Sequence, residues 1–447
     1  MKGFPLLLAL LSLCLPAMAH PTSNDICLPQ ELYLLKGVPF DLFAQPILRR
    51  WRPYDDFVRF SGDQGVRFLR RLSQVATVEG LQDGAELTVS LVNGEEFEEI
   101  KRLSCLLRVA VPGEGEGEVY AQILGDSYTH GQFFRHALLE KGYVPGLKLV
   151  GLRKCGEGQY DEGRGGWSLH TYFSIPRGEN FAYHGFYQPQ GEYRYYGDRA
   201  FWRQVWRVAR GTAPKGFEPQ YSCGRFQEAA LRFEEATGTL LHPSKGDLQY
   251  ESAEKRFLLF DGSRWVPREE REFTWAPDYG KYLEMWDLPA PRFLFVMLGV
   301  NDFRNDYTAD FQQWDERIQA LERSYHQAVP DGLFVLCIPC STMGSLDNAA
   351  GDFTVKQNAA MWRFRNHLIQ RFDGRQQEGV HLLDTGIGVS NDFGYPREGN
   401  EEKTLPFQGY TGQERLEVQM GNPHPYANYN TMGIPLAAFL QYHRTRK

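Results

Sequence analysis

The sequence predicts an α/β fold in which helices cover both faces of a parallel sheet, preceded by a small all-β sandwich domain. Two patterns carry this prediction. Up to residue 111, short strand-like segments alternate with Gly, Asp and Asn turn residues. From residue 119 onward, strands that are apolar throughout alternate with amphipathic helices, which is typical of a parallel sheet buried on both faces.

The expected β-sandwich domain covers residues 20–111. Its clearest strands are Glu31–Leu35, Asp56–Phe60 and Glu86–Leu91, and Asn93-Gly94 forms a typical hairpin turn after the last of them. Residues 112–118 are proline, glycine and glutamate only, with no apolar face. This composition indicates a linker between two domains.

The expected α/β domain covers residues 119–447 and is interrupted by an aromatic-rich insertion at 170–290, which shows no clear periodicity. Its expected strands are mainly apolar runs of the length of a buried strand, at 119–124, 147–152, 293–298, 333–338 and 380–383. Its expected helices are helix-like or amphipathic segments at 132–140, 310–328, 358–372 and 429–443.

Charge and the N-terminal segment restrict the class of protein. The 447 residues carry a net charge of −7, which offers no electrostatic attraction to nucleic acid or to an anionic membrane surface. Residues 1–19 resemble a signal peptide, with Lys2, an apolar run at 6–15 and the cleavage signal Ala17-Met18-Ala19. We therefore expect a secreted or periplasmic protein, cleaved after Ala19 and without a membrane span.

Cysteine and histidine spacing predicts neither a redox centre nor a metal site. The CxxC pair Cys337 and Cys340 ends an apolar strand, whereas a redox motif needs a helix N-terminus to lower its thiol pKa. The histidines show no paired ligand spacing, so no metal or other cofactor is expected. An even number of cysteines permits disulfides in an exported chain; the six that follow the cleavage signal are Cys27, Cys105, Cys155, Cys223, Cys337 and Cys340.

The first apolar strand of the α/β domain leads directly into the segment GDSYTHG at 125–131. In open parallel sheets, ligands bind at the carboxyl ends of the strands. Ser127 at such an end, where a helix begins, would be surrounded by free backbone N–H groups, which suits a nucleophile with a built-in oxyanion donor. The alternative interpretation is that Ser127 only caps the helix.

Four segments together resemble the sequence blocks of the SGNH (GDSL-like) hydrolase family. Residues 125–131 match its GDSxTxG block, Gly165-Gly166-Trp167 is similar to the second block, and GVND at 299–302 matches the GxND block. NPHP at 422–425 is similar to the last block, just before the final helix. The blocks follow in the family's order between residue 119 and the C-terminus. The resemblance implies a flavodoxin-like α/β fold and a serine esterase.

The resemblance also implies a role for each residue. Ser127 would be the nucleophile and His424 the base that takes its proton. The backbone N–H groups of Ser127 and Gly166 and the side-chain amide of Asn301 would donate to the oxyanion. Taken singly, each has a plainer interpretation: a turn for Gly166, an Asx turn for Asn301 and a surface loop for His424.

One position departs from the family pattern. The family carries Asp three residues before the histidine, where this chain has Gly421. His424 then needs another acceptor for its second ring N–H, since that bond fixes its tautomer and orientation. A main-chain carbonyl of residues 419–422 is the nearest candidate, and Asp392 and Glu417 are remote ones. We therefore expect a working but slower Ser-His dyad.

Aromatic residues are dense where the insertion begins, directly after the oxyanion glycine. Interleaved with Arg and Glu, such rings suit sugars, so Trp167, Tyr172 and Trp202 are expected to contact the substrate. The alternative is that the rings form the insertion's own core. Asp161 and Glu162, just before the glycine block, are expected to be solvated loop charges.

These features together resemble bacterial SGNH carbohydrate esterases. They predict a secreted serine esterase that removes acetyl or similar O-acyl groups from an acylated carbohydrate. Two alternatives stay open. A lipase-like or aryl esterase would need a wide apolar cleft, and a non-catalytic glycan-binding protein would have kept the fold after losing the acid at position 421. Fold and motif alone do not fix the substrate.

Overall fold

The structure is a computed structural model of the chain. It describes residues 26–49, 56–72, 74–178, 183–213, 225–306, 308–341, 355–389, 402–404, 411–413, 424 and 429–444. The expected signal peptide, Cys223, Gly421 and the two remote acids Asp392 and Glu417 lie outside these residues.

A seven-stranded sheet forms the centre of the molecule, in the order β10-β11-β8-β18-β19-β20, with β9 also pairing β8. All neighbours on this path are parallel except β10 and β11, which form an antiparallel pair. Every residue of β18 and β20 is buried, as expected for strands covered on both faces. The strands are β8 (Val119–Gly125), β9 (Leu147–Leu149), β10 (Arg153–Gly156), β11 (Gln159–Gly163), β18 (Phe293–Met297), β19 (Leu333–Ile338) and β20 (Val380–Asp384).

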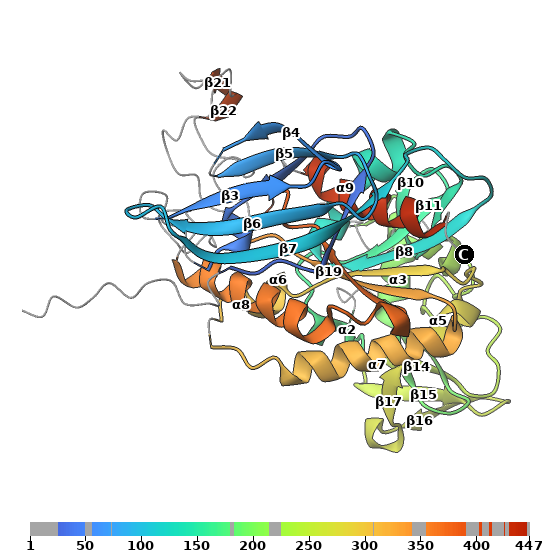
Figure 1. The fold of residues 1–447 in the computed structure, drawn as a ribbon. Coiled ribbons are helices and arrows are strands. Elements are labelled where there is room, and N and C mark those ends of the chain that lie inside the picture. The colour runs from blue at the N-terminus through green and yellow to red at the C-terminus, as the bar shows by residue number, and fades with distance from the viewer. Residues whose placement is uncertain are drawn as a thin grey trace, which may run out of the picture.

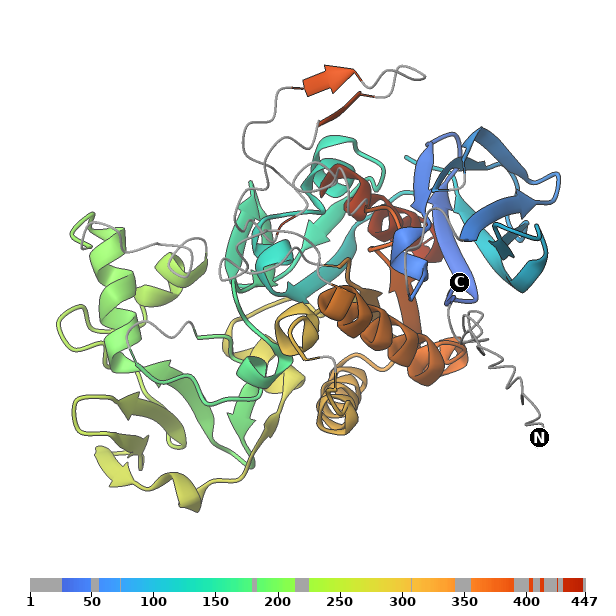
Figure 2. The ribbon, with the colours of Figure 1, turned by 90° about the vertical axis from the view of Figure 1, so that its left-hand side faces the viewer.

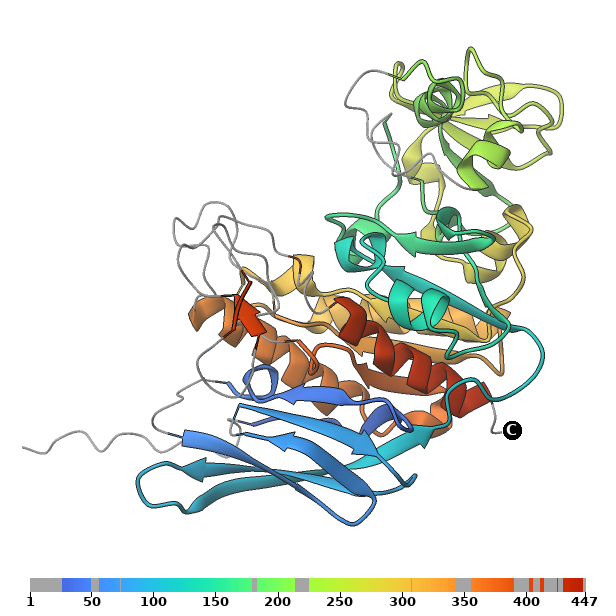
Figure 3. The ribbon, with the colours of Figure 1, turned by 90° about the horizontal axis from the view of Figure 1, so that it is seen from above.

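Helices lie on both faces of this sheet (Figure 1). On one face are α9 (Tyr429–Arg444) and the π-helix η2 (His136–Glu140), and on the other are α5 (Tyr279–Met285), α7 (Gln312–Ala328) and α8 (Val355–Phe372) (Figure 3). Helix α7 shows why such segments dock: its buried residues recur three or four positions apart and so form one apolar stripe. These residues are Trp314, Ile318, Leu321 and Tyr325.

Most of the expected elements of the α/β part are confirmed. The three longest expected helices appear as α7, α8 and α9, shifted by a few residues at their ends. The expected strands appear as β8, β9, β18, β19 and β20. The segment 132–140 is helical only from His136 onward.

The N-terminal region contains two further sheets. One has the order β1-β7-β6-β3 and the other the order β2-β5-β4. The expected hairpin at Asn93 joins β6 to β7, and the Asn93 side chain accepts hydrogen bonds from the N–H groups of Glu95 (2.7 Å) and Glu96 (3.1 Å). The strands are β1 (Glu31–Leu35), β2 (Phe40–Phe43), β3 (Asp56–Gly62), β4 (Val66–Arg71), β5 (Val75–Gly80), β6 (Glu86–Asn93) and β7 (Glu99–Ala110).

Helix α9 packs against this region as well as against the central sheet. The Phe439 ring lies 4.8 Å from the ring of Tyr33 on β1 and 6.3 Å from that of Phe293 on β18. The expected linker at 112–118 also contacts α9, since Arg444 donates to the carbonyl oxygens of Glu116 and Gly117, both at 3.1 Å. A continuous hydrophobic core therefore runs from the N-terminal strands through α9 into the central sheet.

The insertion forms a lobe on the opposite side of the central sheet from the N-terminal strands (Figure 2). Its main sheet has the order β13-β14-β15-β16, and a smaller one pairs β12 with β17. The elements are β12 (Tyr187–Pro189), β13 (Arg194–Asp198), α3 (Arg199–Ala209), α4 (Arg225–Ala230), β14 (Asp247–Glu251), β15 (Arg256–Phe260), β16 (Trp265–Arg268) and β17 (Trp275–Pro277).

Short elements complete the chain. Within the described residues, 3-10 helices lie at Gln45–Ile47, Glu270–Glu272 and Gln376–Glu378. Near the C-terminus β21 (Glu402–Thr404) pairs with β22 (Thr411–Gln413). In the part of the chain that the structure describes, none of the helices is both long enough and apolar enough to cross a bilayer.

Candidate active site

Ser127 lies where the central strand β8 ends and the short helix α1 (Ser127–His130) begins. Asp126 is the N-cap of this helix, and its carboxylate accepts the N–H of Tyr128 at 2.9 Å. The capping interpretation of Ser127 is therefore wrong, because the preceding residue performs that function. The Ser127 side chain is half-buried, at the first helical position, where backbone N–H groups have no partner within the helix.

The second block follows β11, not the strand at 147–149. Gly163, the last residue of β11, is paired with Gly125 at the end of β8, and Arg164 N–H donates to the Gly125 carbonyl at 2.9 Å. Gly166 follows in an exposed turn with φ +77°, a conformation that favours glycine. Gly166 thus lies in a turn, and the space beside its Cα is open.

The third block follows β18 and meets the first block where the carboxyl ends of β18 and β8 lie side by side. Met297 pairs with Gly125, and its carbonyl accepts the N–H of Asp126 at 3.3 Å. Gly299 turns the chain with φ +114°, and a side chain there would collide with Phe364. Helix α6 (Val300–Phe303) starts at this turn, so Asn301 lies in the first turn of a helix at the carboxyl end of the strand.

Two hydrogen bonds join α6 to the second block. The Asn301 side-chain amide donates to the carbonyl of Trp167 at 2.8 Å, and the Asp302 carboxylate accepts the N–H of Leu169 at 3.1 Å. Leu169 is the first residue of α2 (Leu169–Tyr172). Asn301 therefore contacts a residue that is far from it in the sequence. Its amide nitrogen carries a second proton, which can be donated to another acceptor.

Tyr172 ties the first two blocks together. Its hydroxyl lies 2.8 Å from the carbonyl oxygen of Gly125 and 2.6 Å from that of Glu162, and it donates to them. The ring is 3% exposed, so the expectation that Tyr172 contacts substrate is wrong. The residue holds the ends of β8 and β11 at a fixed separation instead.

His424 lies beside the helix that begins with Ser127. Its imidazole packs edge-on against the ring of Tyr128, with the ring centroids 5.6 Å apart. Burial, assisted by the positive charge of Arg304, lowers the pKa of His424 below its ordinary value of 6.5. The ring is therefore neutral at neutral pH, which is the state that can accept a proton. The positions that flank it, Gly421 included, lie outside the described residues.

Burial also perturbs two neighbours of Ser127. It raises the pKa of Asp126 to about 7, and Asp302 adds to that rise. Burial, with help from the charges of Arg153 and Arg164, lowers the pKa of His130 to about 4. Both shifts reduce the charge carried by α1 near neutral pH.

Asp161 and Glu162 are not solvated loop charges, as the sequence suggested. Both are fully buried on β11, where Asp161 pairs with Arg153 at 2.7 Å and Glu162 pairs with Arg164 at 2.6 Å. Burial raises the pKa of both carboxyls, and the two guanidinium groups oppose that rise. Arg153 and Arg164 flank the acidic pair in the sequence, but no pattern in these residues shows that the charges are buried.

The aromatic residues of the insertion are mostly core residues. Trp202 is completely buried, its ring stacks on Phe233 at 4.0 Å, and its indole N–H donates to the carbonyl of Tyr196 at 2.5 Å. Its expected contact with substrate is therefore wrong. Trp167 is 7% exposed and contributes its carbonyl, which orients Asn301. The alternative interpretation, an aromatic core within the insertion, describes these rings correctly.

Neither a metal site nor a reactive thiol is found among the residues that are described. No group of three or more His, Cys, Asp or Glu side chains in those ranges could hold a metal ion. Cys27, Cys105, Cys155 and Cys337 are buried thiols. Burial raises the pKa of Cys337, the opposite of what a redox cysteine requires.

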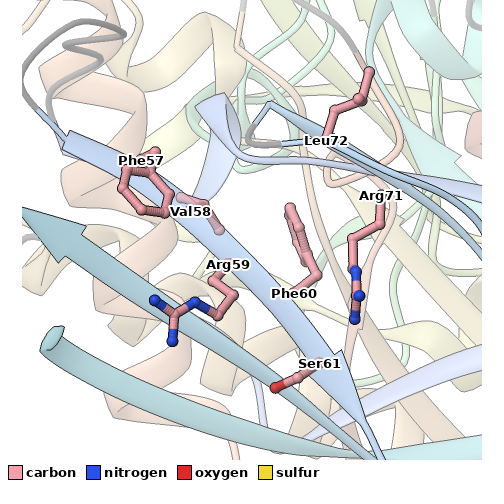
Figure 4. Close-up of a pocket in the computed structure, with 7 residues that line it drawn as sticks. All are labelled: Phe57, Val58, Arg59, Phe60, Ser61, Arg71 and Leu72. Atoms are coloured by element: carbon pink, nitrogen blue, oxygen red, sulfur yellow. The ribbon is translucent and has the colours of Figure 1, made fainter. Parts of the chain in front are cut away.

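A cavity of about 380 Å³ lies in the N-terminal region, away from the strand ends that carry Ser127, Gly166 and Asn301. Figure 4 shows it beside β3 and the end of β4. None of the described site residues lines it. Its walls are formed by Phe57, Val58, Arg59, Phe60, Ser61, Arg71 and Leu72.

Comparisons with known proteins give little guidance. No family model matches the sequence, and no curated protein does. A solved structure described as a possible lipase from Chitinophaga pinensis is similar with a TM-score of 0.29 and 11% identity, over 72% of this chain and 97% of that one. A family two carbohydrate esterase from Cellvibrio japonicus is similar with a TM-score of 0.24 and 12% identity, over 92% and 90%. With scores this low, neither likeness carries an argument about fold or activity.

Proposed function

We propose that this protein is a serine esterase of the SGNH hydrolase type, with Ser127 as nucleophile and His424 as base. One observation carries the proposal. The ends of β8, β11 and β18 meet at Gly125, which brings Ser127, Gly166 and Asn301 to one edge of the sheet. The proposal includes a flavodoxin-like fold, a β-sandwich domain at 20–111 and export after cleavage behind Ala19.

The proposed reaction begins when the Ser127 oxygen attacks the carbonyl carbon of the ester. The neutral His424 imidazole takes the proton of the Ser127 hydroxyl in the same step. The carbonyl oxygen becomes an oxyanion, which accepts from the N–H groups of Ser127 and Gly166 and the Asn301 amide. The C–O bond to the alcohol then breaks, and His424 returns the proton to the leaving oxygen. His424 next takes a proton from water as the water oxygen attacks the acyl carbon. The bond from this carbon to the Ser127 oxygen then breaks, His424 returns the proton to Ser127, and the acyl group leaves as a carboxylic acid.

We propose an acylated carbohydrate as the substrate and an acetyl group as the acyl part. A lipase-like site would need an apolar entrance. The exposed large apolar side chains among the described residues belong to other parts of the molecule, and none of them is on α1, α2 or α6. They are Leu69, Leu72, Leu81, Phe97, Leu106, Val111, Leu231 and Leu241.

The proposed activity is tested by comparing esters of different acyl length. We expect 4-nitrophenyl acetate to be hydrolysed faster than the corresponding octanoate, and acetate to be released from acetylated polysaccharides. Faster hydrolysis of the long-chain ester would favour a lipase-like enzyme. No hydrolysis of any ester would favour a glycan-binding protein without activity.

Replacing Asn301 by alanine is expected to lower kcat by about a hundred- to a thousandfold with little change in KM, as the loss of one oxyanion donor does. The reason is that the Asn301 amide is held in place by the Trp167 carbonyl and has one proton left for the oxyanion. Steady-state kinetics with 4-nitrophenyl acetate measure both constants. The matched control is Asn305→Ala, because Asn305 is exposed and lies just beyond the end of α6. A change in KM alone would show that Asn301 binds the substrate but does not stabilise the transition state further.

The pH profile of kcat/KM should report the neutral His424. Activity is expected to rise with pH through the pKa of this group, because only the unprotonated ring can accept the Ser127 proton. Since burial and Arg304 lower that pKa, the midpoint should lie below 6.5. Rates of 4-nitrophenyl acetate hydrolysis between pH 4 and 8 would show it. A midpoint at or above 6.5 contradicts the environment described for His424.

A further inference from the structure

Arg304 ends the short helix that carries Asn301. It is the C-cap of α6, and its N–H donates to the carbonyl of Val300 at 3.0 Å. Residues three apart in a helix lie on the same side, so Arg304 shares the side of Asn301. Phe303, between them, is buried against the ring of Phe364 at 4.7 Å and points into the core. The backbone therefore directs Arg304 toward the candidate active site.

The electrostatic effects of Arg304 agree with this placement. Its charge lowers the pKa of His424 and also acts on the carboxyl of Asp126. His424 packs against Tyr128 of α1, and Asp126 is the N-cap of this helix. Both groups therefore lie beside Ser127, the first residue of α1. The guanidinium therefore lies within electrostatic reach of both.

Two other arginines near these strand ends are already paired with buried carboxylates. Arg153 and Arg164 are paired with Asp161 and Glu162, and Asp302 accepts the N–H of Leu169. Arg304 makes no ion pair with any residue in the described ranges, although it is half-buried. A partly desolvated guanidinium gains free energy from an anionic partner, and its planar fork matches a carboxylate with two parallel hydrogen bonds.

We propose that Arg304 binds a carboxylate of the substrate, so that the preferred substrates are O-acylated sugars with an acid group close to the ester. This inference rests on the proposed esterase function and names the substrate class for the same site. The carboxylate would be fixed beside the oxyanion donor Asn301, because both side chains project from one turn of α6. When the substrate binds, its carboxylate would also displace water from the Arg304 guanidinium.

The test compares O-acetylated galacturonic acid oligosaccharides with O-acetylated galactose oligosaccharides of the same length, measured by acetate release. The wild-type protein is expected to show a kcat/KM about ten- to a hundredfold higher for the acidic substrate, the range of one charge-assisted hydrogen bond. In Arg304→Gln this ratio should fall to about one, and Arg304→Lys should restore part of it. Arg264→Gln, which removes the same charge from an exposed turn of the insertion, should keep the wild-type ratio.

Ionic strength provides a second measurement that needs no variant. Raising the salt concentration should lower kcat/KM for the acidic oligosaccharide more than for the neutral one, because salt screens a partly exposed ion pair. Equal wild-type rates on the two substrates would overturn the inference and leave the esterase function standing. Equal losses on both substrates in Arg304→Gln would also overturn it, since Arg304 would then act on the reaction itself. If the wild-type protein hydrolyses neither oligosaccharide nor 4-nitrophenyl acetate, the proposed function fails and the inference fails with it.

Discussion

Replacement of Ser127 by alanine is expected to lower kcat for acetyl ester hydrolysis by about 10⁴- to 10⁶-fold, as the loss of a catalytic nucleophile does in serine hydrolases. The fold should be retained with little change in Tm. The Ser127 hydroxyl is not the cap of α1, since Asp126 performs that function, so its removal leaves the helix start intact. Hydrolysis of 4-nitrophenyl acetate and a thermal melt of the same preparation measure both effects.

Ser174→Ala is a suitable control for this experiment. The Ser174 hydroxyl donates to the carbonyl of His170 at 2.9 Å, just beyond helix α2, and has no place in the proposed reaction. This variant should retain the wild-type kcat. Undiminished hydrolysis by pure Ser127→Ala protein would show that another group is the nucleophile.

Replacement of Arg164 by methionine should reduce the free energy of unfolding by about 3–5 kcal/mol, the usual cost of removing one partner of a buried ion pair. Neither Arg164 nor Glu162 has any exposed surface, and the guanidinium lies 2.6 Å from the carboxylate. Without Arg164, Glu162 keeps its contact with the Tyr282 hydroxyl at 2.6 Å but loses the opposite charge. Guanidinium chloride unfolding measures the loss.

The same substitution at an exposed pair provides the control. Arg271 lies 2.7 Å from Glu269, and the two side chains are 84% and 66% exposed. Arg271→Met should therefore change the free energy of unfolding by less than about 1 kcal/mol. The double variant Glu162→Gln and Arg164→Met should recover part of the loss, because no uncompensated charge is left. A similar small effect at both positions would contradict the buried ion pair.

The elements with a strong apolar pattern could be predicted from the sequence. Apolar runs such as 293–297 and 333–338 have the length of buried strands. The stripe of apolar residues on α7 is likewise visible in the sequence. The position of Ser127 at a strand end followed from the same pattern, because β8 is apolar except for Gln122 and ends at Gly125. For these parts, local sequence and tertiary packing favour the same structure.

The strand that carries the second block could not be predicted in this way. β11 consists of Gln159–Gly163, and its middle residues are Asp161 and Glu162. Acidic residues are rare in strands and in cores unless they are paired. Arg153 on β10 becomes the neighbour of Asp161 only after the antiparallel pairing of β10 with β11 has formed. Tertiary contacts therefore determine both the strand and the burial of its charges.

The aromatic residues of the insertion show a second limit. Tyr and Trp have a large apolar ring and one polar atom, so the same residue suits a sugar-binding surface or a core. In Trp202 and Tyr172 the polar atom is satisfied by a main-chain carbonyl, which allows the whole ring to be buried. Composition alone could not distinguish these cases, because only the folded backbone places the deciding carbonyl groups beside the rings.

Helix α9 has a consequence for the order in which the protein can mature during synthesis. The strand β1 is synthesised long before the helix that covers it, since Tyr33 and His443, which meet at 3.4 Å, are 410 residues apart. The apolar face of β1 that α9 covers therefore stays open until α9 has been synthesised. Such long-range closure is slow and leaves the nascent chain open to aggregation. A chaperone that binds the nascent N-terminal strands would protect them until α9 is made, and loss of α9 would leave this face of β1 uncovered.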